Sequence, residues 1–130
     1  MKLLLDTHVV IWALEDAPNL PLKIREMIMD ENNEIYVSVI SLWEIAIKHK
    51  KRPDLLPLSA EEIRYFCQRS GYIFLSLNLD AISSYENIDI TKHYDPFDQI
   101  LVAQSAAHSM RLLTHDDKMK KFDYGFVEVF

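Results

Sequence analysis

The segment KLLLD, residues 2–6, is a short apolar run that ends at a carboxylate. Runs of this kind are typical of strands in a parallel sheet, because helices cover both faces of such a sheet. The next residues, 7–15, place their apolar side chains at near-helical spacing. The start of the chain therefore predicts a buried strand followed at once by a helix, with Asp6 at the junction.

The same alternation of strand and helix patterns continues along the chain. Further strands are predicted at residues 34–39, 72–75, 111–113 and 126–130, and helices from Pro21, over 41–50, from Ser59 to near Gly71, and over 79–85 and 97–108. Parallel neighbouring strands need crossover connections, which helices supply. We expect a single domain over residues 1–130, with an α/β fold of three layers (α/β/α) around a mostly parallel central sheet.

Composition limits the environment and the chemistry of the protein. The single cysteine, Cys67, cannot form an internal disulfide, which fits a reducing cytoplasm. The apolar run near Met1 is too short for a secretory signal or a membrane span. The formal net charge of −6 does not suit a binder held to nucleic acid by bulk electrostatics, but it suits a protein that gathers carboxylates around a divalent cation. We therefore expect a cytoplasmic protein that does not insert into a membrane.

Acidic residues fall beside the predicted ends of strands. Asp6 ends the first strand, Glu44 lies in the helix after the second, Asp95 and Asp98 begin the long helix near the C-terminus, and Asp116 follows the next strand. In an open parallel sheet, ligands bind outside the carboxyl ends of the strands. We therefore expect these acids, distant in sequence, to meet at one edge of the sheet.

Helix capping is the alternative explanation for each acid taken singly. Residues 41–44, SLWE, read as a capping box in which Glu44 reaches back to the helix start. The segment DPFD, residues 95–98, reads as an N-cap, a proline in the first turn and an acid favoured by the helix dipole. Asp6 and the turn at 114–117 also fit caps. Capping does not explain why the acids would share an edge.

Four segments in order resemble the PIN domain and, within that family, the VapC-type toxins of bacterial toxin–antitoxin pairs. They are LLDTH (4–8), SVISLWEIAIK (38–48), HYDPFD (93–98) running into LVAQ (101–104), and LLTHD (112–116). One such segment would be weak support, whereas four in order over nearly the whole chain are specific.

The resemblance implies roles for particular residues. It assigns an acidic quartet of Asp6, Glu44, Asp98 and Asp116. Asp95 would be a nearby supporting acid, and Thr7 and Thr114 would be polar neighbours that orient carboxylates or water. The chain departs from similar toxins at Gln99, where they often carry arginine, and at residues 50–54, which lack a common Gly-Lys-Leu turn. Both departures concern substrate recognition rather than the quartet.

Phosphodiester hydrolysis gives a chemical reason for such a quartet. Divalent ions neutralise the phosphate, activate water and stabilise the leaving oxygen, and Mg²⁺ or Mn²⁺ prefers oxygen ligands. Asp6 and Asp98 are the expected direct ligands, and Glu44 and Asp116 would complete the shell. Clustered carboxylates repel one another, so at least one should hold its proton more tightly than a free acid does.

The resemblance thus predicts a Mg²⁺- or Mn²⁺-dependent endoribonuclease that acts as a toxin on tRNA or rRNA, forms a homodimer and binds a small antitoxin. The alternative is a PIN-type nuclease that acts on DNA, or in general RNA processing. A phospho-accepting receiver domain or a haloacid-type phosphatase would need a second acid just after the first strand. Asp6 is instead followed by Thr7 and His8, so the sequence does not fit either class. The predicted RNA-binding residues are Lys48, Lys50 and Lys51, which would bind RNA phosphates. The alternative explanation is that they are simply the cations that helix C-termini and solvent-exposed surfaces favour. We expect supporting or packing roles for His93, and core packing for Trp43.

Overall fold

A computed structural model describes the whole chain, residues 1–130, around a five-stranded sheet in the order β3-β2-β1-β4-β5. The strands are β1 (Lys2–Leu5), β2 (Glu34–Ser38), β3 (Ile73–Leu75), β4 (Arg111–Thr114) and β5 (Val127–Val129). Every neighbouring pair is parallel. The predicted α/β fold with a parallel central sheet is confirmed, and the first predicted strand becomes the middle strand of the sheet.

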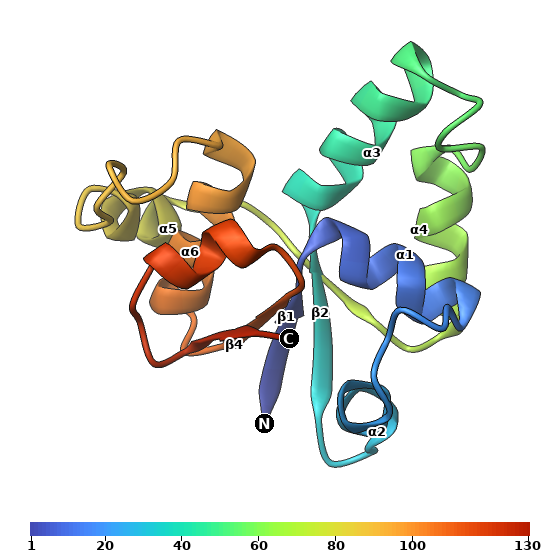
Figure 1. Cartoon of the computed structure of the whole chain (residues 1–130), viewed down its shortest axis with the longest axis horizontal. Coiled ribbons are helices and arrows are strands. Elements are labelled where there is room, and N and C mark those ends of the chain that lie inside the picture. The colour runs from blue at the N-terminus through green and yellow to red at the C-terminus, as the bar shows by residue number, and fades with distance from the viewer.

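Helices cover both faces of the sheet (Figure 1). They are α1 (Thr7–Glu15), α2 (Leu22–Met29), α3 (Val39–Lys51), α4 (Ala60–Arg69), α5 (Leu79–Tyr85), α6 (Pro96–Ala107) and the 3₁₀ helix η1 (Asp117–Lys121). Leu3 and Leu5 of β1 pack in the core formed with α1 to α4, whereas Leu4 packs in a second core with α6 and η1. This alternation along one strand produces the predicted three layers. None of the helices has the length and apolar character that a membrane span requires.

The register of the sheet aligns the carboxyl ends of its central strands. Leu5 of β1 lies opposite Val37 of β2 on one side and Leu113 of β4 on the other. The backbone N–H of Asp6 donates to the carbonyl of Leu113 at 3.0 Å, so the chain leaves β1 directly beside the end of β4. The residues that follow β1, β2 and β4 therefore emerge at one edge of the sheet.

Helix α3 begins earlier than the sequence predicts. Ser38, the last residue of β2, caps the helix, and its Oγ accepts from the backbone N–H of Ile40 at 3.1 Å. Ser41 and Glu44 consequently lie inside the helix, and the predicted capping box at residues 41–44 is wrong. A capping box does form at the start of α4, where Ser59 and Glu62 exchange side-chain and backbone hydrogen bonds of 3.2 Å.

Two other features differ from the sequence predictions. The 3₁₀ helix η1, which follows β4, has no counterpart among the predicted elements. Trp43 on α3 is 59% exposed rather than packed in the core, and its ring lies 5.4 Å from that of Phe97, measured between centroids. Trp43 therefore lies on the exposed side of α3, and Phe97 at the start of α6 contacts its ring.

Candidate active site

Asp6 is buried, and neighbouring groups hold both of its carboxylate oxygens. The backbone N–H of Thr7 donates to Oδ1 at 2.7 Å, which caps α1, and the Thr114 hydroxyl donates to Oδ2 at 2.6 Å. The capping interpretation of Asp6 is therefore right, and it is compatible with a functional role. The bond to Thr114 ties the end of β1 to the end of β4 and fixes the orientation of the carboxylate.

Thr114 also connects Asp6 to Asp116. Its Oγ1 accepts from the backbone N–H of Asp116 at 3.1 Å while its hydroxyl proton is donated to Asp6. Asp116 then caps η1 by accepting from the backbone N–H of Lys118 at 2.9 Å. The buried hydroxyl of Thr114 thus sets the distance between the acids that follow β1 and β4.

Asp98 approaches the same place from α6. The helix starts with Asp95, whose Oδ1 accepts from the backbone N–H of Phe97 at 2.9 Å, and Pro96 occupies the first turn. This start turns Asp98 inward, where it is 8% exposed. Asp95 itself remains at the surface as the cap.

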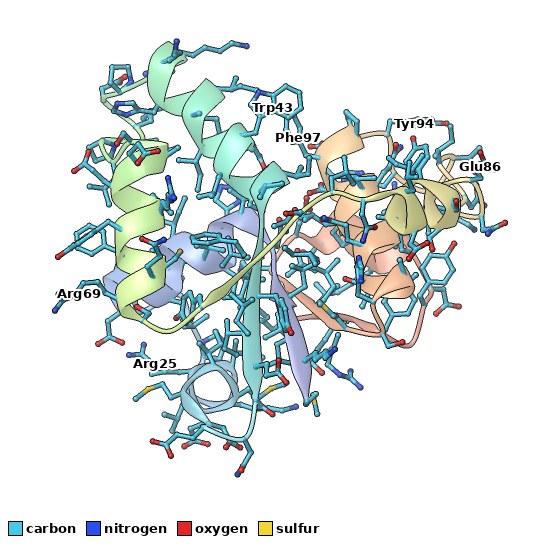
Figure 2. The ribbon with its side chains drawn as sticks, turned by 180° about the vertical axis from the view of Figure 1, so that it is seen from behind. Arg25, Trp43, Arg69, Glu86, Tyr94 and Phe97 are labelled. Atoms are coloured by element: carbon cyan, nitrogen blue, oxygen red, sulfur yellow. The ribbon has the colours of Figure 1, made fainter.

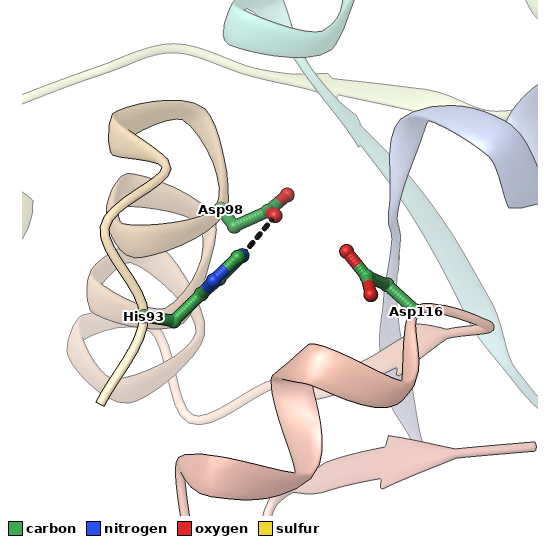
Figure 3. A group of neighbouring side chains, drawn as sticks. All are labelled: His93, Asp98 and Asp116. Carbon is green, nitrogen blue, oxygen red and sulfur yellow. Dashed lines mark hydrogen bonds and ion pairs between the residues drawn. The ribbon is translucent and has the colours of Figure 1, made fainter.

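His93 is the member of the site whose role the sequence left open. Its Nε2 lies 2.7 Å from Oδ2 of Asp98, and its ring meets Phe122 edge to face. Single ligand atoms of His93, Asp98 and Asp116 lie within 4.8 Å of one another (Figure 3). A histidine five residues before a buried aspartate was the only signal in the sequence, because the contact depends on how the segment before α6 turns.

Gln99 holds that segment in place. Its Nε2 donates to the backbone carbonyl of His93 at 2.6 Å, and its Oε1 accepts from the Tyr85 hydroxyl at 2.7 Å. Gln99 is buried, so both ends of its amide are used. Gln99, where similar toxins often carry arginine, therefore links α5 and α6 to His93, the residue that contacts Asp98.

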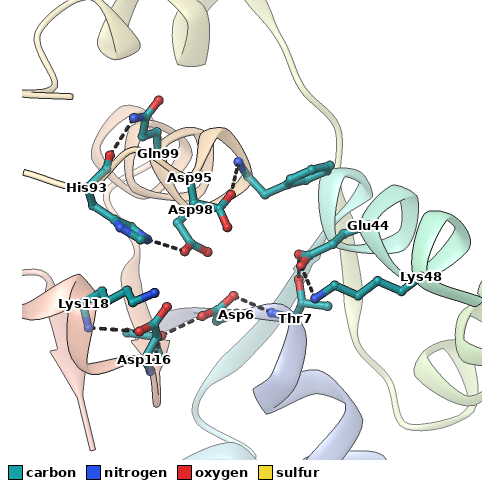
Figure 4. A network of polar contacts seen from close by, with 12 residues as sticks. Asp6, Thr7, Glu44, Lys48, His93, Asp95, Asp98, Gln99, Asp116 and Lys118 are labelled. Atoms are coloured by element: carbon teal, nitrogen blue, oxygen red, sulfur yellow. Dashed lines mark hydrogen bonds and ion pairs between the residues drawn. The ribbon is translucent and has the colours of Figure 1, made fainter. Parts of the chain in front are cut away.

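Glu44 lies on the other side of Asp6. The Thr7 hydroxyl lies 2.7 Å from Oε1 of Glu44 and donates to it, and Lys48 pairs with Oε2 at 2.7 Å (Figure 4). Ser41 supports the arrangement, with its Oγ 3.1 Å from Oγ1 of Thr7. The predicted quartet thus gathers at one edge of the sheet, with Glu44 joined to the other acids through Thr7.

The three lysines predicted to bind RNA have different surroundings. Lys48 is paired with Glu44, and Lys48 and Lys51 line a groove of about 570 Å³ that also includes Thr7 and Trp12. Lys50 is exposed on α3 and does not line this groove. Their assignment to RNA stays a prediction.

The family model of the PIN domain matches residues 3–124. This chain belongs to the PIN domain family. Two solved structures share the fold: VapBC2 from Rickettsia felis bound to a DNA fragment from their promoter (TM-score 0.72, 16% identity, 100% of this chain and 98% of that chain), and DNA-bound VapBC from Salmonella typhimurium (TM-score 0.67, 19% identity, 100% and 97%). No curated protein matches the sequence significantly. The resemblance inferred from four short segments is confirmed at the level of the family and the fold.

Burial and like charges raise the pKa values of two carboxylates in this PIN domain, Asp6 and Asp98. Burial, and then the charge of Asp6, raises the pKa of Asp98 to about 7, against the opposing hydrogen bond from His93. Burial also raises the pKa of Asp6, with a further contribution from Glu44, against the hydrogen bonds from Thr114 and Thr7. The expected proton retention in the cluster is therefore present at two carboxylates.

This donor set fits a hard divalent cation. Its atoms are carboxylate oxygens with one nearby imidazole, and no thiol takes part, which is the chemistry that Mg²⁺ and Mn²⁺ prefer. Burial and, to a lesser extent, repulsion between carboxylates raise the pKa values of Asp6 and Asp98, and the charge of a divalent ion would offset both causes.

In the metal-free protein, Asp98→Asn should raise the free energy of unfolding at about pH 8 by on the order of 1 kcal/mol. The folded-state pKa of Asp98 lies above its ordinary value, so the ionised carboxylate costs stability at a pH above about 7. The wild type should therefore gain stability relative to the variant as the pH falls below 7. Urea unfolding in chelator at several pH values measures this difference.

Asp80→Asn, which neutralises an exposed acid on α5, is the matched control. An Asp98→Asn protein that is less stable than the wild type at every pH would contradict the electrostatic account of the site.

Proposed function

We propose that this PIN domain is a metal-dependent endoribonuclease and the toxin of a toxin–antitoxin pair. The main support is the meeting of Asp6, Asp98 and Asp116, which come from separate parts of the fold. Asp6 and Asp98 are buried and the charge of Asp6 acts on Asp98, while the half-buried Asp116 has a carboxylate oxygen within 4.8 Å of one of Asp98. Glu44 extends the cluster on the side of α3. Structural ion pairs do not require such a gathering of like charges, whereas a nuclease centre does.

Asp6 and Asp98 would hold the ion directly, and Asp116 and Glu44 would complete its surroundings. When bound, the ion supplies neutralisation of the phosphate, activation of water and stabilisation of the leaving oxygen. The chain's own residues keep the acids in position: Thr114 fixes Asp6, and His93 holds one oxygen of Asp98. The other oxygen of Asp98 points away from His93 (Figure 3).

Glu44 would position the attacking water. Its Oε1 is held by Thr7 and its Oε2 by Lys48, so the carboxylate has a fixed orientation at the rim of the site. The Lys48 ammonium balances the charge of Glu44 and lies where an RNA phosphate would approach. Lys51 extends the positive charge along the groove, and Lys50 would contact RNA from the exposed side of α3.

The proposed substrate is structured RNA such as tRNA or rRNA, and the proposed partners are an antitoxin and a second copy of the chain. The two solved structures that share the fold are complexes named VapBC, which supports an antitoxin partner here. An apolar groove of about 290 Å³ on α3 and α6, which includes Trp43 and Phe97, supports an association surface. With these partners and substrates, the protein would act in the cytoplasm.

Expression of the chain alone, with and without Asp6→Ala, tests the proposed function. The unmodified chain should arrest growth and produce new RNA ends, and Asp6→Ala should do neither at equal protein level. Asp80→Ala, at an exposed position on α5, should behave as the unmodified chain does. New RNA ends without growth arrest would contradict the toxin role and support a role in general RNA processing instead. Cut DNA with intact RNA would contradict the proposed substrate.

A further inference from the structure

A second cleft opens from the active site on the side away from α3. It has a volume of about 400 Å³ and lies between the segment that precedes α6 and the helix η1. Its lining residues are Thr91, Lys92, His93, Tyr94, Asp95, Asp116, Lys118 and Lys121. Because His93 and Asp116 belong to both, the cleft is continuous with the carboxylate cluster.

We propose that this cleft is a nucleotide subsite, in which Lys118, Lys121 and Lys92 bind a backbone phosphate next to the one that is cleaved and Tyr94 stacks on the adjoining base. The proposal rests on the nuclease function proposed above. It adds a place on this chain for the part of the substrate strand that extends beyond the scissile bond.

The lysines of the cleft have free charges. None of Lys92, Lys118 and Lys121 takes part in an ion pair, whereas Lys120 on the same 3₁₀ helix pairs with Asp117 at 3.0 Å. In a protein with a net charge of −6, unpaired cations grouped in one cleft mark where an anion can be held. Lysine suits phosphate binding because its ammonium group is a compact charge at the end of a flexible side chain, which can reach a phosphate in many orientations.

Lys118 is fixed beside the chemistry by its backbone. Its N–H donates to Oδ1 of Asp116 at 2.9 Å, so its side chain starts next to a proposed ion-binding carboxylate (Figure 4). This backbone bond survives any substitution of the side chain except proline. Changes at Lys118 therefore test the ammonium without disturbing the position of Asp116.

The two cationic regions lie on opposite sides of the acids. In Figure 4, Asp6 and Asp98 lie between Lys118 on one side and Lys48 on the other. A strand that places one phosphate at the carboxylates would therefore meet positive charge in both directions. The carboxylates themselves repel the backbone, so flanking cations are needed to hold it there.

Tyr94 makes the cleft suited to a nucleotide rather than to a free phosphate. Tyr94 as a residue is 76% exposed, although it lines the cleft together with Lys92. Figure 2 shows it at the surface of the loop that leads into α6. An exposed aromatic ring next to free cations is the combination that binds single-stranded nucleic acid, because every base has a face on which such a ring can stack.

Fluorescence anisotropy with a short labelled single-stranded RNA, and with DNA of the same sequence, tests the subsite. All proteins carry Asp98→Asn so that the probe stays intact, and the salt concentration is varied. The double substitution Lys118→Ala, Lys121→Ala should weaken RNA binding about tenfold. It should also flatten the slope of log K against log salt by about 1.4, because each phosphate that a lysine neutralises on a single strand adds about 0.7 to that slope. Tyr94→Ala by itself should also weaken RNA binding, whereas Tyr94→Phe should bind as the parent protein does because the aromatic ring remains.

Lys120→Ala is the matched control, because Lys120 lies on the same helix but is paired with Asp117 and does not line the cleft. It should leave both the affinity and the salt slope unchanged. If the double variant behaves as Lys120→Ala does while the parent protein binds RNA, the subsite is overturned and the nuclease proposal stands. A parent protein that binds neither RNA nor DNA would overturn both. If the substitutions weaken DNA binding as much as RNA binding, the subsite is supported and its ligand is either nucleic acid.

Discussion

Replacing Asp98 with asparagine is expected to lower the rate of RNA cleavage about a thousandfold or more, because the variant keeps the shape of the site and loses one charge needed to hold the ion. An asparagine oxygen can still accept the hydrogen bond that His93 makes to Asp98 at 2.7 Å. The start of α6 depends on Asp95 and Pro96, which are unchanged. The loss should therefore appear in kcat, with an unchanged circular dichroism spectrum.

Single-turnover cleavage of a labelled RNA, with protein in excess, is the appropriate measurement. Asp80→Asn removes the same charge from the exposed surface of α5 and should retain the full rate. Cleavage by Asp98→Asn at near the wild-type rate would remove Asp98 from the active site, whatever its burial and its pKa.

Removal of divalent metal ions is expected to abolish cleavage, and addition of Mg²⁺ or Mn²⁺ to restore it. Without a cation, burial and the charge of Asp6 raise the pKa of Asp98 to about 7, so the site competes for protons near neutral pH. Protons and metal ions bind the same oxygens, and the affinity for the ion should therefore fall as the pH drops below 7. Cleavage rates in chelator, and titrations with Mg²⁺ on either side of pH 7, measure both effects.

Undiminished cutting of RNA in excess chelator would show that the carboxylates act without an ion. An affinity for Mg²⁺ that did not change with pH would contradict the raised pKa of Asp98 while leaving the metal dependence intact.

The layers of the fold and the gathering of the acids were predictable because their causes are local. The apolar run before Asp6 and the alternation of strand and helix patterns require a parallel sheet covered on both faces. Since parallel strands end at one edge, the acids that follow β1 and β4 had to meet there. Four ordered segments also sufficed to predict the PIN family.

The details that failed depend on how distant segments pack. Ser38 and Ser41 are equally good caps by residue type, and only the end of β2 selects Ser38. The contact of His93 with Asp98 requires the turn before α6, which Gln99 fixes through a hydrogen bond that no periodicity reveals. Trp43, expected in the core, is exposed and contacts Phe97 of α6, which is distant from it in sequence.

Crystals of the protein grown with Mn²⁺, and measured for anomalous scattering, locate the bound ion directly. The strongest anomalous peak should lie within coordination distance of carboxylate oxygens of both Asp6 and Asp98, on the side that faces Asp116, and it should be absent from Asp98→Asn crystals. A peak elsewhere on the molecule, with the oxygens of Asp6 and Asp98 left without an ion at saturating Mn²⁺, would contradict a shared metal centre.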